Sequence, residues 1–178
     1  RIGSILLVVA MLMTLLPVGV FAAGTDSKLP SEDGAKIKVE YTDQKDQSQV
    51  VYYSNVDSDD RNSDHFWDPV SDLGKDVENA KGQAVVTLLD DITLTDTTIL
   101  VDKGKDIVID GQGKYSITWN MTGAVADMSD PGNQAISIAE DGDKLQLKDV
   151  TLNVVGSGEN NGNQGIVNYG TLTVKNSI

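Results

Sequence analysis

The chain has 178 residues and no cysteine, so a buried core must hold it together without disulfides. Its 27 acidic residues against 14 Lys and Arg give a net charge of −13. A domain this acidic repels nucleic acid and anionic lipid, so we expect neither as a partner, and solubility outside the cell is the simplest explanation of the charge.

The first 22 residues predict a secretory signal peptide. Arg1 is followed by an apolar run over 5–16 and then by Val20, Phe21 and Ala22, a small-x-Ala ending that precedes cleavage. The alternative is an uncleaved membrane anchor, but the run is short for a hydrocarbon core of about 30 Å. We therefore expect a secreted or cell-surface protein with no stable membrane insertion after cleavage. Because the chain does not begin with Met, we also expect its true start to be missing.

A hairpin is predicted next. Residues 23–35 are polar and rich in turn formers, which is typical of a flexible linker. Ile37 and Val39 then alternate with polar residues, and 50–53 is a second short apolar run, so two strands joined by a polar turn are expected. This N-terminal unit spans 36–70 and ends in an acidic loop.

The acidic loop raises the question of calcium. Its carboxylates at Asp57, Asp59, Asp64 and Asp68 partly follow the spacing of an EF-hand loop. However, Asn62 replaces the glycine of that motif, and no helix pattern precedes the loop. A solvated acidic loop is therefore our main interpretation, with no cofactor, and a Ca²⁺ site is the alternative.

A short helix is predicted over 71–82. Ser71 is suited to the N-cap, Leu73 and Val77 fall on one face, and Lys81 and Gly82 are typical of a helix end. Such a helix would cap the strands that follow by covering an open strand edge.

From residue 84 onward, strand-forming segments recur every 27 to 38 residues. Three of them share one pattern and predict in-register neighbours: 106–111, 144–149 and 171–176. This alignment places Asp106 beside Lys144, and Asp110 beside Lys148 and then Lys175, on a solvated face of mixed charge. A parallel β-helix (solenoid) is expected over 84–178.

The segments 85–94, 107–117 and 166–178 resemble right-handed parallel β-helix proteins of the pectin-lyase-like type, especially the adhesin-like surface members exported by Gram-positive bacteria. The resemblance covers 84–178 and implies an all-β, right-handed parallel β-helix, with the predicted helix before it as the N-terminal cap. It specifies the fold better than the function, because such scaffolds carry lyases, hydrolases, adhesins and spacers alike. The chain ends in a strand at Ile178, so we expect an N-terminal fragment whose coils are truncated at the C-terminus.

Adhesion, or display of loops to an extracellular glycan or a host or cell-surface protein, is the function we expect. Two long insertions, 120–134 and 156–164, leave the repeat at equivalent points and should emerge side by side on a rigid scaffold. Within and beside them, the candidate ligand-binding residues are Trp119, Asn120, Asn160 and Asn161. For Trp119 the alternative is a side chain that simply packs.

The alternative function is a polysaccharide lyase or hydrolase whose active site lies in later coils. Related enzymes combine a carboxylate cluster with Arg or His, whereas Arg61 and His65 both precede the coils here, so no catalytic residue is assigned. A purely structural spacer is a third reading. One further polar residue, Asn168, aligns with the inward position of Ile138, and we expect it to satisfy backbone groups at a bend.

Overall fold

The computed structural model describes residues 28–29, 31–54, 79–95, 98–121, 134–156 and 164–178. Within them the protein is all-β and contains no helix. The strands are β1 Lys28–Leu29, β2 Ile37–Thr42, β3 Ser48–Tyr53, β4 Gln83–Leu88, β5 Ile92–Thr95, β6 Ile99–Val101, β7 Asp106–Asp110, β8 Ser116–Met121, β9 Gln134–Ile138, β10 Lys144–Lys148, β11 Thr151–Gly156, β12 Gln164–Asn168 and β13 Thr171–Lys175.

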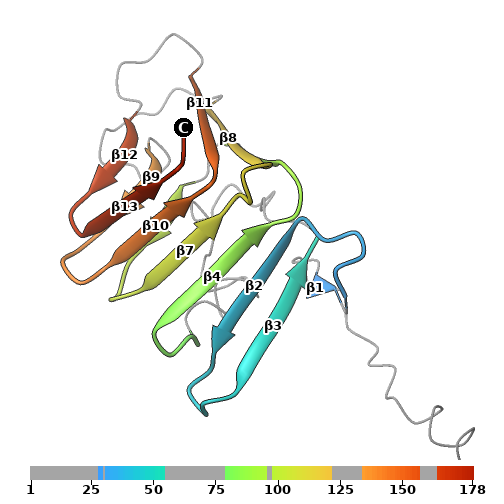
Figure 1. The fold of residues 1–178 in the computed structure, drawn as a ribbon. Helices are drawn as coiled ribbons and strands as arrows, with labels where there is room; N and C mark the ends of the chain where they lie inside the picture. The colour runs from blue at the N-terminus through green and yellow to red at the C-terminus, as the bar shows by residue number, and fades with distance from the viewer. Residues whose placement is uncertain (1–27, 30, 55–78, 96–97, 122–133, 157–163) are drawn as a thin grey trace, which may run out of the picture.

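These strands form three sheets. The largest has seven strands in the order β1-β3-β2-β4-β7-β10-β13, and the other two have the orders β11-β8-β5 and β12-β9-β6. Figure 1 shows the seven strands side by side, from the hairpin at one edge to β13 at the other. From β4 onward every pairing is parallel.

The predicted stacking of the three matched segments is confirmed residue by residue. Asp106 pairs with Lys144, and Lys144 with Thr171; Asp110 pairs with Lys148, and Lys148 with Lys175. Apolar residues at the second and fourth positions of each strand point to the same side, because side chains alternate along a strand. The repeat in the sequence therefore fixes the register.

The hairpin is also confirmed, since β2 and β3 pair antiparallel from Ile37↔Tyr53 to Thr42↔Ser48. The linker expected over 23–35 contains β1, which pairs antiparallel with the end of β3. β2 also pairs antiparallel with β4, with Val39 opposite Val86, and this pairing joins the hairpin to the parallel strands.

The predicted fold class, a parallel β-helix with a capping helix over 71–82, is wrong for the described part of the chain. The largest sheet is mixed, and the other two are small parallel sheets. Residues 71–78 lie outside the described residues, and 79–82 form a turn and bends instead of a helix end. The reason is that β2 occupies the edge of β4, and the N–H of Lys81 donates to the carbonyl of Thr42 at 2.6 Å, which ties this turn to the hairpin.

The core lies on the inward side of all three sheets. Its largest fully buried side chains include Trp119 of β8 and Tyr53 of β3. The hairpin contributes Ile37 and Val39 to the same cluster, which therefore continues from the parallel strands into the antiparallel part. Burial of this shared apolar surface stabilises the contact between the two parts, with a free energy of about 25 cal/mol per Å² of buried area.

The bends between strands depend on particular residues. Asp149 and Asn176 follow β10 and β13 with φ of 48° each, a left-handed conformation that Asp and Asn adopt more readily than most residues. At another bend the carboxylate of Asp143 is fully buried, and it accepts N–H bonds from Gly104 at 2.7 Å and Glu140 at 3.0 Å. These polar groups fix the bends because a buried amide without a partner would be costly.

Candidate functional site

The outward side of the seven-stranded sheet is a regular polar face, which we call the outer face. On its parallel part, three rows of side chains run across the strands, about 4.8 Å apart from strand to strand. The rows consist of Thr87, Asp110, Lys148 and Lys175; of Val85, Val108, Gln146 and Thr173; and of Gln83, Asp106, Lys144 and Thr171.

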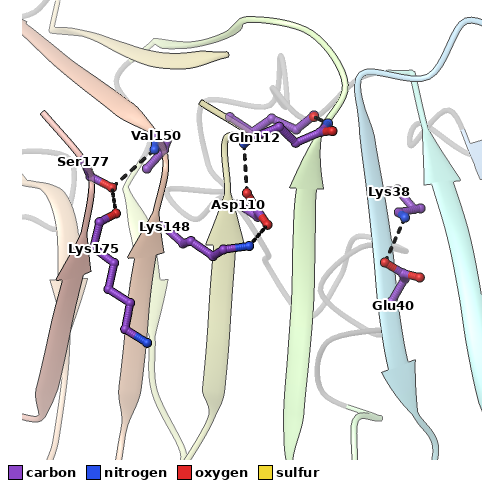
Figure 2. A network of polar contacts seen from close by, with 9 residues as sticks. Lys38, Glu40, Asp110, Gln112, Lys148, Val150, Lys175 and Ser177 are labelled. Atoms are coloured by element: carbon purple, nitrogen blue, oxygen red, sulfur yellow. Dashed lines mark hydrogen bonds and ion pairs between the residues drawn. The ribbon is translucent and has the colours of Figure 1, made fainter. Parts of the chain in front are cut away.

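The first row is organised around an ion pair. The ammonium of Lys148 lies 2.6 Å from Oδ2 of Asp110, and the backbone N–H of Gln112 donates to Oδ1 at 2.9 Å (Figure 2). Partial burial alone would raise the pKa of Asp110, but the two hydrogen bonds outweigh it and the pKa is lowered. The same contact raises the pKa of Lys148. Both groups are charged at neutral pH.

The third row repeats this arrangement more loosely. Oδ2 of Asp106 lies 3.8 Å from the ammonium of Lys144, and Oδ1 accepts a bond of 3.0 Å from the side-chain amide of Gln83. Between the two charged rows lie Val85 and Val108, and Val108 is buried although it points outward. The outer face thus has a narrow apolar strip, formed by Val85 and Val108, between two ion pairs.

The hairpin extends this face. Lys38 of β2 pairs with Thr87 of β4, and its ammonium forms an ion pair of 2.9 Å with Glu40. The hydrogen bond that the ammonium of Lys38 donates to Glu40 is the main cause of the raised pKa of Lys38, and burial opposes it. This extension was not predicted from the sequence, although the alternation of Ile37 with Lys38 was the signal that one side of β2 faces outward.

The chemistry of the outer face suits binding better than proton transfer. A general acid at neutral pH needs a raised carboxyl pKa, whereas that of Asp110 is lowered by its partners. A row of paired charges beside apolar side chains can instead contact an extended polar ligand or a protein surface. In the described residues, no group of three or more His, Cys, Asp or Glu side chains is arranged to hold a metal ion.

The described strands bear out the prediction that the two insertions are attached at equivalent points. β8 pairs with β11 up to Met121↔Gly156, and β9 pairs with β12 from Gln134↔Gln164. Both insertions therefore leave and rejoin the sheets at neighbouring positions. The insertions themselves, 122–133 and 157–163, lie outside the described residues.

The candidate ligand-binding residues have different outcomes. Trp119 is fully buried in the core, so it packs, as the alternative interpretation had it, and it presents no ring for stacking on a sugar. Asn120 is half-buried and pairs with Val155 of β11. Outside the described residues lie Asn160 and Asn161, and so do the calcium candidates Asp57, Asp59, Asp64 and Asp68.

Asn168 acts at a bend, as expected. It pairs with Ile138, and its Oδ1 accepts the N–H of Gly170 at 3.0 Å. Its side chain is exposed, however, because no described strand follows β12 in that sheet. Sequence reasoning missed the buried Asp143 nearby, for which the Glu-Asp-Gly-Asp turn at 140–143 was the available signal.

Comparison of the chain with protein-family models, curated proteins and solved structures finds no match. These comparisons therefore do not test the resemblance to pectin-lyase-like adhesins. None of the described residues belongs to a helix that is long and apolar enough to cross a bilayer.

Proposed function

We propose that this is an exported display protein, whose sheets present the outer face and the two insertions to an extracellular glycan or protein. The observation that carries the proposal is the matched attachment of the insertions at Met121↔Gly156 and Gln134↔Gln164. Loops held together on a rigid scaffold are a common way to build a binding surface. Export is proposed from the sequence of residues 1–22.

The lengths of the connections between the two small sheets support this function. The equivalent connection between β5 and β6 has only three residues, 96–98, whereas the insertions add 122–133 and 157–163 between the same two sheets. The short connection indicates that the sheets themselves do not need the extra residues. Their presence is better explained by contact with a partner than by folding.

The test is to replace each insertion by the short connection Asp-Thr-Thr of residues 96–98, singly and together. Binding of the full chain and of the variants to glycan arrays and to intact cells is then compared, with circular dichroism to check folding. We expect unchanged far-ultraviolet spectra and at least a tenfold loss of binding in the double variant, about 1.4 kcal/mol. Full binding by a folded double variant would contradict the proposal.

A matched control separates the insertions from the outer face. Val85→Lys places a charge in the apolar strip between the paired charges, far along the sequence from either insertion. If the insertions bind the partner alone, this variant binds normally. If the outer face shares the contact, binding falls in this variant too. Cleavage of a polysaccharide by the full chain would instead favour the enzyme alternative.

A further inference from the structure

The outward side of the small sheet β11-β8-β5 is built from uncharged polar residues, and we call it the hydroxyl face. Leu94 of β5 and Trp119 of β8 are buried in the core, and side chains alternate along a strand, so the residues on either side of them point outward. Figure 1 shows β11 and β8 side by side. The hydroxyl face consists of Thr93 and Thr95 on β5, of Ser116, Thr118 and Asn120 on β8, and of Thr151, Asn153 and Val155 on β11.

The composition of the hydroxyl face differs from that of the outer face. The outer face carries charged side chains in pairs, such as Asp110 with Lys148. On the hydroxyl face every residue except Val155 carries a hydroxyl or an amide group, and none carries a charge. The two sheets therefore suit ligands of different chemistry, although they belong to one scaffold.

The hydroxyl face is accessible and held rigidly. Thr93 is exposed, and Thr118 and Asn120 are half-buried. The opposite sides of the same strands lie in the core, where Leu94 and Trp119 are fully buried, so the backbone beneath the face is fixed. A strand paired with the outer edge of β11 would lengthen this face and would not cover it. Binding to a surface that is already ordered costs little conformational entropy.

The side chains of the hydroxyl face can both donate and accept hydrogen bonds. The side-chain amide of Asn153 donates to Oγ1 of Thr118 at 3.3 Å. The hydroxyl of Thr118 keeps its own hydrogen to donate, and the Oδ1 of Asn153 can accept. With Thr93 they form a row that crosses the three strands at intervals of about 4.8 Å. This interval is close to the length of one sugar unit in an extended polysaccharide, whose hydroxyls likewise donate and accept.

Charge excludes an acidic ligand from this face. The chain has a net charge of −13, which repels polyanions, and the hydroxyl face has no Lys or Arg to offset the repulsion. At its border the carboxylate of Asp91 accepts the backbone N–H of Ser116 at 2.8 Å and its hydroxyl at 2.9 Å. These bonds lower the pKa of Asp91, so it is ionised at neutral pH. The ligand that fits is rich in hydroxyl groups and uncharged.

We propose that the hydroxyl face binds an extended neutral polysaccharide, with successive sugar units lying across β5, β8 and β11. The sugar hydroxyls form hydrogen bonds with the row of Thr93, Thr118 and Asn153. This inference rests on the proposed display function and names its ligand class. The position of the face agrees with that function, because β8 and β11 end at Met121 and Gly156, where both insertions begin.

The test compares neutral and acidic sugars of equal length. Cellohexaose, mannohexaose and hexagalacturonate are each titrated into the full chain while the backbone amides of Thr93, Thr118 and Asn120 are followed by nuclear magnetic resonance. We expect a neutral hexasaccharide to shift these amides and hexagalacturonate to leave them unchanged. Thr118→Val removes one hydroxyl and keeps the size and strand preference of the side chain. It should weaken binding of the neutral sugar roughly two- to tenfold, the effect of one lost hydrogen bond.

Matched variants separate this inference from the display function. Thr87→Val makes the same change on the outer face; if it weakens sugar binding and Thr118→Val does not, the inference is overturned and the sugar lies on the outer face. Thr93→Val repeats the test on β5 if circular dichroism shows that Thr118→Val does not fold. Binding to cells or to hexagalacturonate without binding to a neutral hexasaccharide would overturn the inference and leave the display function standing. A full chain that binds neither glycans nor cells would contradict both.

Discussion

The two edges of the parallel strand array differ in whether a described strand pairs with them. At the first end, β2 pairs antiparallel with β4, and Ile37 and Val39 of the hairpin are fully buried. At the other end, no strand in the described part of the chain pairs with the outer edge of β13, and Val174 is 54% exposed there. The comparison shows that an antiparallel hairpin can close a parallel array, since it satisfies the edge hydrogen bonds and covers the apolar side chains together.

The largest effect should come from removing a side chain in the interior of a sheet, compared with the same column position on its last described strand. Trp119→Ala deletes a fully buried ring from β8, and we expect a loss of about 3–5 kcal/mol in the free energy of unfolding. Val154 is its ladder neighbour on β11 and is 42% exposed, so Val154→Ala should change stability by no more than about 0.5 kcal/mol.

Urea denaturation followed by circular dichroism measures both variants. If Trp119→Ala does not fold, Trp119→Leu offers a smaller cavity and should still cost clearly more than Val154→Ala. Equal losses at the two positions would show that β11 is covered in solution and would contradict the comparison.

A smaller effect is expected at the bend that precedes β13. A Cβ on Gly170 would lie 2.5 Å from the carbonyl oxygen of Asp143 and 2.7 Å from that of Glu140, and neither backbone atom can move easily. Gly170→Ala should therefore destabilise the protein by about 1–3 kcal/mol. Gly165 of β12 is the matched control, because its Cβ would meet nothing within 4 Å. The midpoints of thermal unfolding of the two variants are compared. If Gly170→Ala unfolds at the same temperature as the unaltered chain, the bend can move enough to admit the methyl group, and the prediction is wrong.

The smallest effect concerns acid. The pKa of Asp110 is lower in the folded protein than its ordinary value of about 3.9, so its stabilising effect is present above that value and is lost as the pH falls through the folded pKa. Asp110→Asn should reduce stability at neutral pH and make the decline below pH 4 less steep.

Lys148→Met should have the same effect on the acid limb, because the ammonium of Lys148 is a main cause of the lowered pKa of Asp110. Unfolding by urea between neutral and acid pH gives the two slopes. An acid limb identical to that of the unaltered chain in both variants would show that this pair does not contribute to the pH dependence.

Most of the strand positions could be predicted from the sequence. The segments 106–111, 144–149 and 171–176 repeat one pattern, and a one-residue slip would turn every apolar side chain outward, so the register follows from the pattern alone. The predicted helix over 71–82 failed at its end, where Lys81 and Gly82 form bends. Helix-end signals act over a few residues, and the contact of Lys81 with Thr42 overrides them there.

The candidate site, like the fold, could be predicted from the sequence only in part. The sequence by itself determined the strands from β2 onward, the parallel pairing from β4 to β13, the pairing of Asp110 with Lys148 and the neighbouring attachment of the insertions, because local periodicity specifies all four. Only the tertiary structure decided that Trp119 is part of the core and that the hairpin pairs with the edge of β4. Burial and edge pairing depend on which segments meet across the fold, and a linear pattern does not contain that information.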